Sequence, residues 1–292
     1  MEKVLKVLIT GVTGYIGSHL AKVLFEAGHE ITGLDIEWKK HNDVTRYCHR
    51  ILIKDVTRHV IDEDYDVIVH LAGLIQVEES VALPTRYYAT NLGGTVNMLR
   101  QGFNGQPHFI FASTAGAFDA QSPYARSKLA AEDVIKEQSD NYTIFRFFNV
   151  AGSDGMHRQV GRASHLIRIA AEAAAGKRDY MYMYGDDYDT KDGTCVRDYI
   201  HVVDLVNAIR DTIKHGAFNT PYECIGSGKG YSVKEVINTM KEVTGVDFQV
   251  KITGRRDGDP ASLAITNQFN LLHPQYNLRD MCLSAYRIET KV

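Results

Sequence analysis

The stretch ITGVTGYIG at residues 9–17 decides the fold of this 292-residue chain. It continues an apolar run that is typical of a buried strand, and it opens a helical pattern of apolar side chains. Gly11 permits a tight turn, Gly14 lets the backbone approach a pyrophosphate, and Gly17 lets the helix pack closely on the strand. The N-terminus of the helix offers N–H groups and positive potential to phosphate oxygens. The stretch predicts a dinucleotide site; the alternative is an ordinary glycine-rich turn.

Outward from this stretch, short β-branched runs alternate with longer helical patterns. The predicted strands cover residues 4–10, 30–35, 51–55, 66–73, 108–114 and 142–149. The predicted helices cover residues 15–27, about 84–100, 123–138, 165–175 and 232–243. Strands that alternate with helices form crossover units and a parallel sheet with helices on both faces. We therefore expect an α/β fold with a Rossmann-type doubly wound parallel sheet, and a smaller mixed α/β domain.

The texture of the chain changes after residue 149, where a polar, glycine-rich segment begins. We expect residues 1–148 and about 194–220 to form the dinucleotide domain. Residues from about 149 to 193 and from 221 to 292 would form the second, substrate-binding domain.

Charge and composition exclude several classes of protein. Lys and Arg number 33 and Asp and Glu 36, so the net charge of −3 argues against nucleic acid as a partner. No apolar run reaches the roughly 18–20 residues that span a membrane, and the N-terminus lacks a signal-peptide pattern. The four cysteines are scattered, which favours a reducing, cytoplasmic location. No His or Cys cluster has metal-ligand spacing, so we expect no metal.

An acidic residue at the end of the second predicted strand, Asp35, indicates which dinucleotide binds. Its carboxylate can accept bonds from the ribose hydroxyls and would repel a 2′-phosphate, which favours NAD over NADP. Lys39 and Lys40 lie nearby and weaken that preference. Asp55 either reaches the adenine or is a solvated acid at a strand end. The remaining residues predicted at this site are Tyr15, Ile16, Val56, Leu71, Ala72 and Gly73.

The segment SPYARSK at residues 122–128 places Tyr124 and Lys128 four apart on a predicted helix, and therefore on one face. A lysine ammonium and a nicotinamide cation would stabilise the phenolate and lower the pKa of the tyrosine. Ser113 and Thr114 end a strand, where a hydroxyl can bind a substrate oxygen. The alternative is that the tyrosine and lysine are an ordinary surface pair.

At this point the chain resembles a known family, the extended short-chain dehydrogenase/reductases. Four further stretches resemble the UDP-glucose 4-epimerase family within it. They are FRFFNVAG at 145–152, GDDYDTKDGTCVRDYIHVVDL at 185–205, GSGKGYSV at 226–233 and GRRDGDPA at 254–261. The resemblance covers nearly the whole chain, and it implies an NAD-dependent isomerase that epimerises a UDP-hexose at carbon 4 through a 4-keto intermediate.

The resemblance also implies roles for individual residues. Tyr124 would be the catalytic base, Lys128 its partner and a ligand of the nicotinamide ribose, and Thr114 the hydroxyl beside them. Asn91 would lie close to that site. The substrate-binding residues would be Asn149, His165, Leu166, Tyr182, Met183, Tyr184, Arg197, Tyr199, Arg256 and Asp259. Two of these, Arg197 and Arg256, would grip the diphosphate, because guanidinium groups match phosphate oxygens. For Arg197 the alternative is an ion pair with Asp198 or Asp204.

Several interpretations stay open within and outside the family. A UDP-N-acetylhexosamine or UDP-uronate/pentose 4-epimerase remains an alternative, and Leu263 does not decide whether an N-acetyl group fits. A 4,6-dehydratase is disfavoured because Ala115 and Gly116 stand where such enzymes carry acids. An NAD-sensing regulatory protein is disfavoured because the Tyr and Lys pair is retained. The connection between Thr114 and Tyr124 is shorter than in the family, which leaves the sugar end more open.

A homodimer is also implied by the resemblance. The family dimerises through two helices, which correspond here to residues 84–100 and 123–138. The alternative for these two helices is ordinary packing against the sheet.

Overall fold

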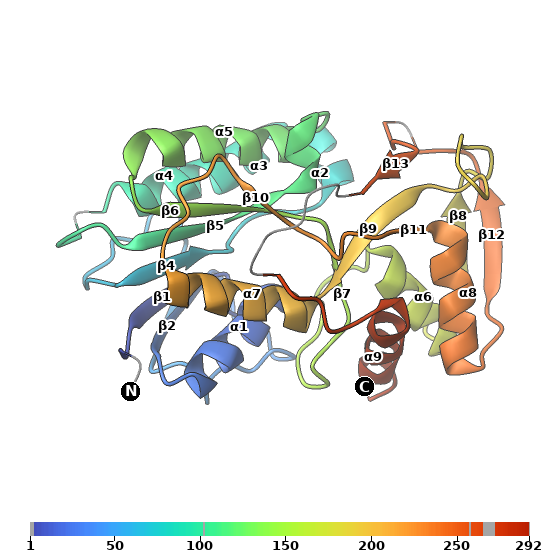
Figure 1. The fold of residues 1–292 in the computed structure, drawn as a ribbon, viewed down its shortest axis with the longest axis horizontal. Helices are drawn as coiled ribbons and strands as arrows, with labels where there is room; N and C mark the ends of the chain where they lie inside the picture. Colours follow the sequence, from blue (N-terminus) through green and yellow to red (C-terminus); the bar gives the residue numbers. More distant parts are fainter. Residues whose placement is uncertain (1–2, 102, 257, 265–271, 292) are drawn as a thin grey trace. The chain divides into compact units, whose positions relative to one another are not determined.

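The computed structural model describes residues 3–101, 103–256, 258–264 and 272–291 (Figure 1). The chain divides into two compact units, each of which we describe by itself. The first comprises Met1–Phe147 and Val206–Glu223, and the second comprises Phe148–Leu205 and Cys224–Val292. None of the described helices is both long and apolar enough to cross a lipid bilayer.

A parallel sheet forms the centre of the first unit. Its strand order is β10-β6-β5-β4-β1-β2-β3, and the pairs from β6 to β3 are all parallel. The strands are β1 (Lys6–Thr10), β2 (Glu30–Asp35), β3 (Arg50–Ile53), β4 (Val67–His70), β5 (His108–Thr114), β6 (Tyr142–Phe147) and β10 (Glu223–Ile225), of which only Glu223 belongs to this unit. Strands covered on both faces are continuous apolar runs, as in β1, where all residues after the first are buried.

Helices cover both faces of this sheet. In Figure 1, α4 and α5 lie on one face, and α1 and α7 on the other. The helices of the unit are α1 (Tyr15–Glu26), α2 (Val77–Ala82), α3 (Pro84–Tyr87), α4 (Gly93–Leu99), α5 (Pro123–Gln138) and α7 (Val202–His215), whose first turn belongs to the second unit. A short 3-10 helix, Ala115–Phe118, follows β5. The predicted doubly wound α/β fold is confirmed.

The helix predicted over residues 84–100 is interrupted. A π-helical turn, Tyr88–Leu92, separates α3 from α4. Such turns are rare and occur often at functional sites. Here the turn carries Asn91, which is 1% exposed and donates its amide to the carbonyl oxygen of Leu74.

The second unit is smaller and mixed. Its strands are β7 (Asn149–Ala151), β8 (Tyr180–Tyr184), β9 (Val196–His201), β11 (Gly230–Ser232), β12 (Gln249–Thr253) and β13 (Ser262–Leu263). Its helices are α6 (Leu166–Ala174), α8 (Val233–Thr244) and α9 (Leu278–Thr290). Strand β9 pairs with β7, β11 and β13, while β8 pairs with β12. Residues 194–205 belong to the second unit, whereas the sequence predicted them in the first.

Candidate active site

The glycine-rich turn after β1 is tightly packed. Gly11 has φ +73°, and a Cβ atom added there would lie 2.9 Å from the backbone nitrogen of Ala72. A Cβ on Gly14 would lie 2.9 Å from the carbonyl oxygen of Gly11, and one on Gly17 would overlap the same oxygen. The predicted close approach of helix to strand at Gly17 is therefore present. The backbone of this turn also abuts the predicted Leu71–Gly73 turn after β4.

The N-terminus of α1 is suited to a diphosphate. Gly14 is its N-cap residue, and no side chain in the described part of the chain caps it. The half-buried residues Tyr15 and Ile16 form the first turn. Backbone N–H groups at an uncapped helix N-terminus bind phosphate oxygens. The turn therefore leaves backbone N–H groups available to the phosphates of a dinucleotide.

Asp35, at the end of β2, is held by several donors. One carboxylate oxygen accepts bonds from the backbone nitrogen and the hydroxyl of Thr13, at 3.0 and 2.8 Å. The other accepts from the backbone nitrogen of Ile36 at 2.8 Å and from Lys39 Nζ at 3.4 Å. The side chain is 5% exposed. The predicted ribose-binding carboxylate is therefore preorganised, with the ammonium group of Lys39 as its one mobile neighbour among these donors.

Asp55 has a local structural role. Its Oδ1 accepts bonds from the backbone nitrogen of Thr57 at 2.9 Å and from its hydroxyl at 2.8 Å. The backbone bond is the main reason why the pKa of this carboxyl is lowered. The neighbouring Val56 is buried, and its carbonyl oxygen accepts from Asn97. The structure thus shows Asp55 stabilising a turn, while a contact with adenine stays a prediction.

Three predicted site residues converge at the carboxyl end of β4. A Cβ atom on Gly73 would lie 2.9 Å from Asn91 Oδ1 and 3.3 Å from Lys128 Nζ. Asn91 is fixed by the backbone nitrogen of Leu74 at 2.8 Å and by the hydroxyl of Ser127 at 3.0 Å. Ligands bind to open α/β sheets at this edge. The predicted turn, amide and lysine therefore share one location.

Lys128 is an unusual lysine because it is only 3% exposed. Its Nζ donates to the carbonyl oxygen of Ala112 at 2.8 Å and lies 4.7 Å from the centre of the Phe111 ring. Burial lowers the pKa of Lys128 to about 8, and the carboxylate of Glu132 opposes this shift. A lysine with such a pKa retains its charge near neutral pH and titrates just above it.

Tyr124 lies one helical turn before Lys128 on α5. Burial raises the pKa of its phenol, and a hydrogen bond with Thr114 acts in the opposite direction. The ring of Tyr87 packs edge-on, with centres 6.4 Å apart. The sequence predicted a pKa lowered by the ammonium group of Lys128 together with a nicotinamide cation. Of the protein groups alone, burial raises the pKa, and Thr114 is the group that opposes this shift.

Of the two candidate hydroxyls on β5, only Thr114 contacts Tyr124. Its Oγ1 also accepts from the backbone nitrogen of Gly116 at 3.1 Å. Ser113 is buried, and its hydroxyl donates to the carboxylate of Glu132. Successive side chains of a strand point to opposite faces. A catalytic role for Ser113 therefore lacks support in this arrangement.

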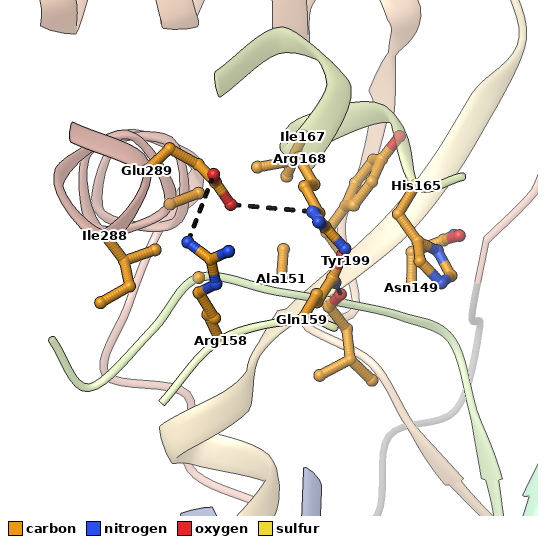
Figure 2. Close-up of a pocket in the computed structure, with 13 residues that line it drawn as sticks. Asn149, Ala151, Arg158, Gln159, His165, Ile167, Arg168, Tyr199, Ile288 and Glu289 are labelled. Carbon is orange, nitrogen blue, oxygen red and sulfur yellow. Dashed lines mark hydrogen bonds and ion pairs between the residues drawn. The ribbon is translucent and has the colours of Figure 1, made fainter. Parts of the chain in front are cut away.

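In the second unit, a pocket gathers three of the predicted substrate-binding residues, Asn149, His165 and Tyr199 (Figure 2). The amide of Asn149 donates to the carbonyl oxygen of Asp198 at 2.9 Å, which holds it at the start of β7. Tyr199 is buried, and burial raises its pKa. The remaining lining residues are Val150, Ala151, Gly152, Arg158, Gln159, Ile167, Arg168, Ala285, Ile288 and Glu289.

Basic side chains form one side of this pocket. Figure 2 shows the guanidinium groups of Arg158 and Arg168 turned toward Glu289, at 3.8 and 3.7 Å. Arg168 also pairs with Glu172 at 3.0 Å. The predicted contact residue Leu166 instead packs against the core of the unit. The sequence analysis did not predict Arg158 or Arg168 as site residues.

Arg197 and Asp259 form an ion pair with each other. The distance from Arg197 Nη2 to Asp259 Oδ1 is 2.8 Å. The alternative partners that the sequence left open are engaged elsewhere: Asp198 accepts from the backbone nitrogen of Ser227, and Asp204 from that of Gln275. Arg197 and Tyr199 are two residues apart on β9 and thus point to the same face. Two predicted residues that are far apart in the sequence, Arg197 and Asp259, therefore meet.

Strand β8 presents tyrosines on one face only. Tyr182 is 46% exposed, and the guanidinium of Arg256 lies 3.9 Å from the centre of the Tyr184 ring. Met183 is 4% exposed and belongs to the apolar core of the unit. The alternation of the strand thus removes the Met183 side chain from the face that the two tyrosines share. The predicted substrate contact by the Met183 side chain is therefore not supported.

Two charged residues that were not predicted from the sequence connect α5 to the sheet: Glu132, on the inner face of α5, and Arg146, on β6. Glu132 is fully buried, and Arg146 on β6 binds its carboxylate through two nitrogens, at 2.9 and 2.7 Å. One feature of the sequence indicates Glu132, because this residue follows Lys128 by four positions on the helix face that also carries Tyr124. Nothing in the sequence alone marks the arginine.

Comparison with known proteins gives a consistent result. The model of the NAD dependent epimerase/dehydratase family matches residues 7–224. A UDP-glucose 4-epimerase of Halalkalibacterium halodurans is 36% identical over 301 aligned residues, which cover 90% of this chain and 87% of that protein.

Solved structures agree. The UDP-glucose 4-epimerase of Bifidobacterium longum, in complex with NAD+ and UDP, superposes with a TM-score of 0.88 at 28% identity, and the match covers 98% of each chain. The UDP-Glc/GlcNAc 4-epimerase of Campylobacter jejuni has a TM-score of 0.78 at 36% identity, over 98% of this chain and 99% of that one.

Proposed function

Because this chain belongs to the NAD-dependent epimerase/dehydratase family, we propose that it is an isomerase that interconverts UDP-hexoses of the UDP-glucose/UDP-galactose type at carbon 4. Its similarity to UDP-glucose 4-epimerases over about 90% of its length supports this activity. The prediction of NAD as the cofactor agrees with the family.

The observation that carries the proposal is the arrangement on α5. Tyr124 contacts Thr114, and Lys128 lies one turn away with its ammonium group beside Gly73. The glycine cradle at Gly11 abuts the same β4 turn. A proton acceptor, a buried cation and a phosphate cradle thus belong to one sheet edge.

These residues suggest a simple division of the chemistry. NAD, when bound, would supply the reversible two-electron redox chemistry that a change of configuration at carbon 4 of the sugar requires. Tyr124 removes the proton of the 4-hydroxyl and later returns it. Thr114 orients the phenol by its hydrogen bond, and the charge of Lys128 favours the phenolate.

The second unit offers the groups for the nucleotide. Arg197 and Arg256 supply guanidinium groups for the diphosphate, and Tyr182 and Tyr184 supply a ring face for uracil. Asn149, His165 and Tyr199 line the pocket described above. A substrate held by its nucleotide leaves the hexose free to turn over, which a change of configuration requires.

One alternative keeps the mechanism and changes the sugar. The Campylobacter jejuni relative is described as acting on both UDP-Glc and UDP-GlcNAc, which favours UDP-N-acetylhexosamines as a second substrate class. A dehydratase finds less support, because Ala115 and Gly116 form the start of the 3-10 helix after Thr114 and neither side chain can donate a proton.

The test is to incubate the purified protein with UDP-glucose and with UDP-N-acetylglucosamine and to identify the sugars by chromatography. We expect a 4-epimer. A 4-keto-6-deoxy sugar would instead indicate a dehydratase. If no product forms from any UDP-sugar, the protein would be a regulatory protein rather than an enzyme. Tyr124→Phe should lower turnover by roughly a thousandfold while NAD and UDP still bind. Tyr286→Phe, which removes a hydroxyl from α9, is the control, and unchanged turnover in Tyr124→Phe would refute the proposed base.

We also propose a homodimer that forms through the α3–α4 segment and α5. Val96 on α4 is 39% exposed, which leaves an apolar side chain of this segment available to a partner. A cytoplasmic location remains a prediction from the scattered cysteines.

A further inference from the structure

A buried ion pair connects α5 to the sheet, and its carboxylate lies two turns beyond Tyr124 on the same helix. Glu132 has no exposed surface, and its two oxygens bind Nε and Nη2 of Arg146 at 2.9 and 2.7 Å. The hydroxyl of Ser113 donates to the same carboxylate. Lys136, near the surface, lies 3.8 Å away. The carboxylate is thus fully engaged, and its geometry is bidentate and specific.

The pair ties three elements together. Ser113 and Arg146 are register partners on β5 and β6, and Glu132 reaches them from α5. Tyr124, Lys128 and Glu132 follow one another at intervals of four residues, so they share a helix face. The pair therefore fixes the position of α5 along the sheet and its rotation about the helix axis. It thereby fixes the position of the Tyr124 phenol.

The same arginine also holds the short connection that precedes Tyr124. The Arg146 guanidinium lies 3.8 Å from the centre of the Tyr222 ring and 4.9 Å from that of Phe118. Phe118 ends the 3-10 helix that follows Thr114. Both partners of the Tyr124–Thr114 hydrogen bond are therefore anchored, directly or through their segment, to one ion pair.

Stability alone does not account for such a pair. A buried ion pair costs so much desolvation that apolar residues of the same volume often stabilise a core equally well. A fixed charge next to a titratable group has a second effect, because it shifts the pKa of that group. Glu132 lies one turn from Lys128, whose charge it favours, and the compensating Arg146 lies on the neighbouring strand.

The other titratable groups near the site do not duplicate this charge. His70 on β4 is fully buried, and burial lowers its pKa to about 3, so it is neutral. Tyr87 on α3 faces Tyr124, and its hydroxyl donates to Glu79 of α2 at 2.8 Å. Among the described residues of α5 and of the elements packed against it, Glu132 and Arg146 are the residues that pair opposite charges with both side chains buried.

We propose that Glu132 and Arg146 are positioning residues of the active site, which fix α5 over the sheet and balance the electric field at Lys128 and Tyr124. The inference rests on the proposed function only in giving Tyr124 the role of the base.

The test measures the pH dependence of kcat/KM for the UDP-hexose in NAD-loaded enzyme. Glu132→Gln leaves the arginine cation uncompensated, which favours the phenolate, so the acid limb should move to lower pH. Arg146→Met leaves the carboxylate uncompensated, and the limb should move to higher pH. Each shift should be about half a pH unit or more. The double variant Glu132→Gln/Arg146→Met should return the acid limb to its wild-type pH.

Position and charge are separated by a conservative change. Arg146→Lys keeps the cation but loses the bidentate fork and the ring contacts, so kcat should fall roughly tenfold to a hundredfold with the acid limb unmoved. The double variant Glu132→Gln/Arg146→Met should lose kcat to a similar extent. Glu26→Gln, which breaks the exposed pair with Lys22 on α1, is the control and should change neither quantity.

Shifts in the same direction, or no shift, in the two single variants would overturn the electrostatic part of the inference. If Glu132→Gln and Arg146→Met do not fold, the double variant and Arg146→Lys still test the positioning part. An unchanged kcat in both of these proteins would overturn it. A readout without substrate separates this from failure of the proposed function. The absorbance of tyrosinate in each variant, minus that of the same variant with Tyr124→Phe, titrates the phenol directly and should show the same opposite shifts.

Discussion

At the scale of single residues, the glycine turn shows how little space the cofactor cradle leaves. A Cβ atom on Gly17 would overlap the carbonyl oxygen of Gly11, which is backbone and cannot move aside without displacing the turn. Gly254, by contrast, has open space around its Cα and no positive φ. Alanine substitutions at the two positions can therefore be compared. The comparison separates the loss of stability caused by steric overlap of the new methyl group from that caused by the loss of a glycine.

Gly17→Ala should lower the free energy of unfolding by about 2 kcal/mol or more, because overpacking forces the backbone to shift. It should also weaken NAD binding. Gly254→Ala should change neither. Denaturant unfolding and calorimetric titration with NAD measure both effects. Equal stability of the two variants would show that the turn relaxes freely.

Lys128 makes stability depend on pH. Burial lowers its pKa to about 8 from an ordinary value of 10.5, so between these values the unfolded chain binds more protons than the folded one. The free energy of unfolding of the NAD-free protein should therefore rise with pH across this window, by about 3 kcal/mol from this group.

Unfolding of wild type and Lys128→Met at a series of pH values isolates this contribution. The difference between the two proteins should change between pH 8 and 10.5 and be constant below pH 7. Lys136→Met, on the same helix but near the surface, should retain the wild-type slope. A Lys128→Met protein with that same slope would show that the charge is solvated.

At the scale of elements, the α3–α4 segment has two faces with different tasks. One carries the buried Asn91 in its π-helical turn, and the other exposes Val96. Val96→Glu should shift the protein from dimer to monomer in sedimentation velocity experiments, because a carboxylate cannot be buried unpaired at an interface. Val60→Glu, at a 68% exposed valine outside these helices, is the matched control. A wild-type monomer would refute the dimer.

At the scale of the whole molecule, the cofactor residues belong to the first unit and the predicted nucleotide-sugar residues to the second. Two adjacent arginines test this division. Arg256 lies over Tyr184, whereas Arg255 pairs with Asp187. Arg256→Met should raise KM for the UDP-hexose roughly tenfold to a hundredfold and leave NAD affinity unchanged. Arg255→Met should change KM little, and the reverse pattern would reassign the diphosphate contact.

The doubly wound fold can be predicted from the sequence alone, and so can the glycine turn of the proposed cofactor cradle. Its signals for these are local: a glycine spacing, alternating strand and helix periods, and two side chains one helical turn apart on α5. Strand β5 and helix α5 have the bounds that the sequence predicts. Helices α2, α7 and α9 were not predicted, and the helix over residues 84–100 was predicted without its π-helical turn.

Long-range packing selects which side chains meet. It pairs Arg197 with Asp259, turns Ser113 away from Tyr124 and places Met183 in a core. It also brings Arg146 to Glu132 across 14 residues of sequence. Strand alternation and register set these contacts, and both depend on pairings between distant segments. Local periodicity therefore indicates where an active site forms, while long-range packing selects the partners that set its charge.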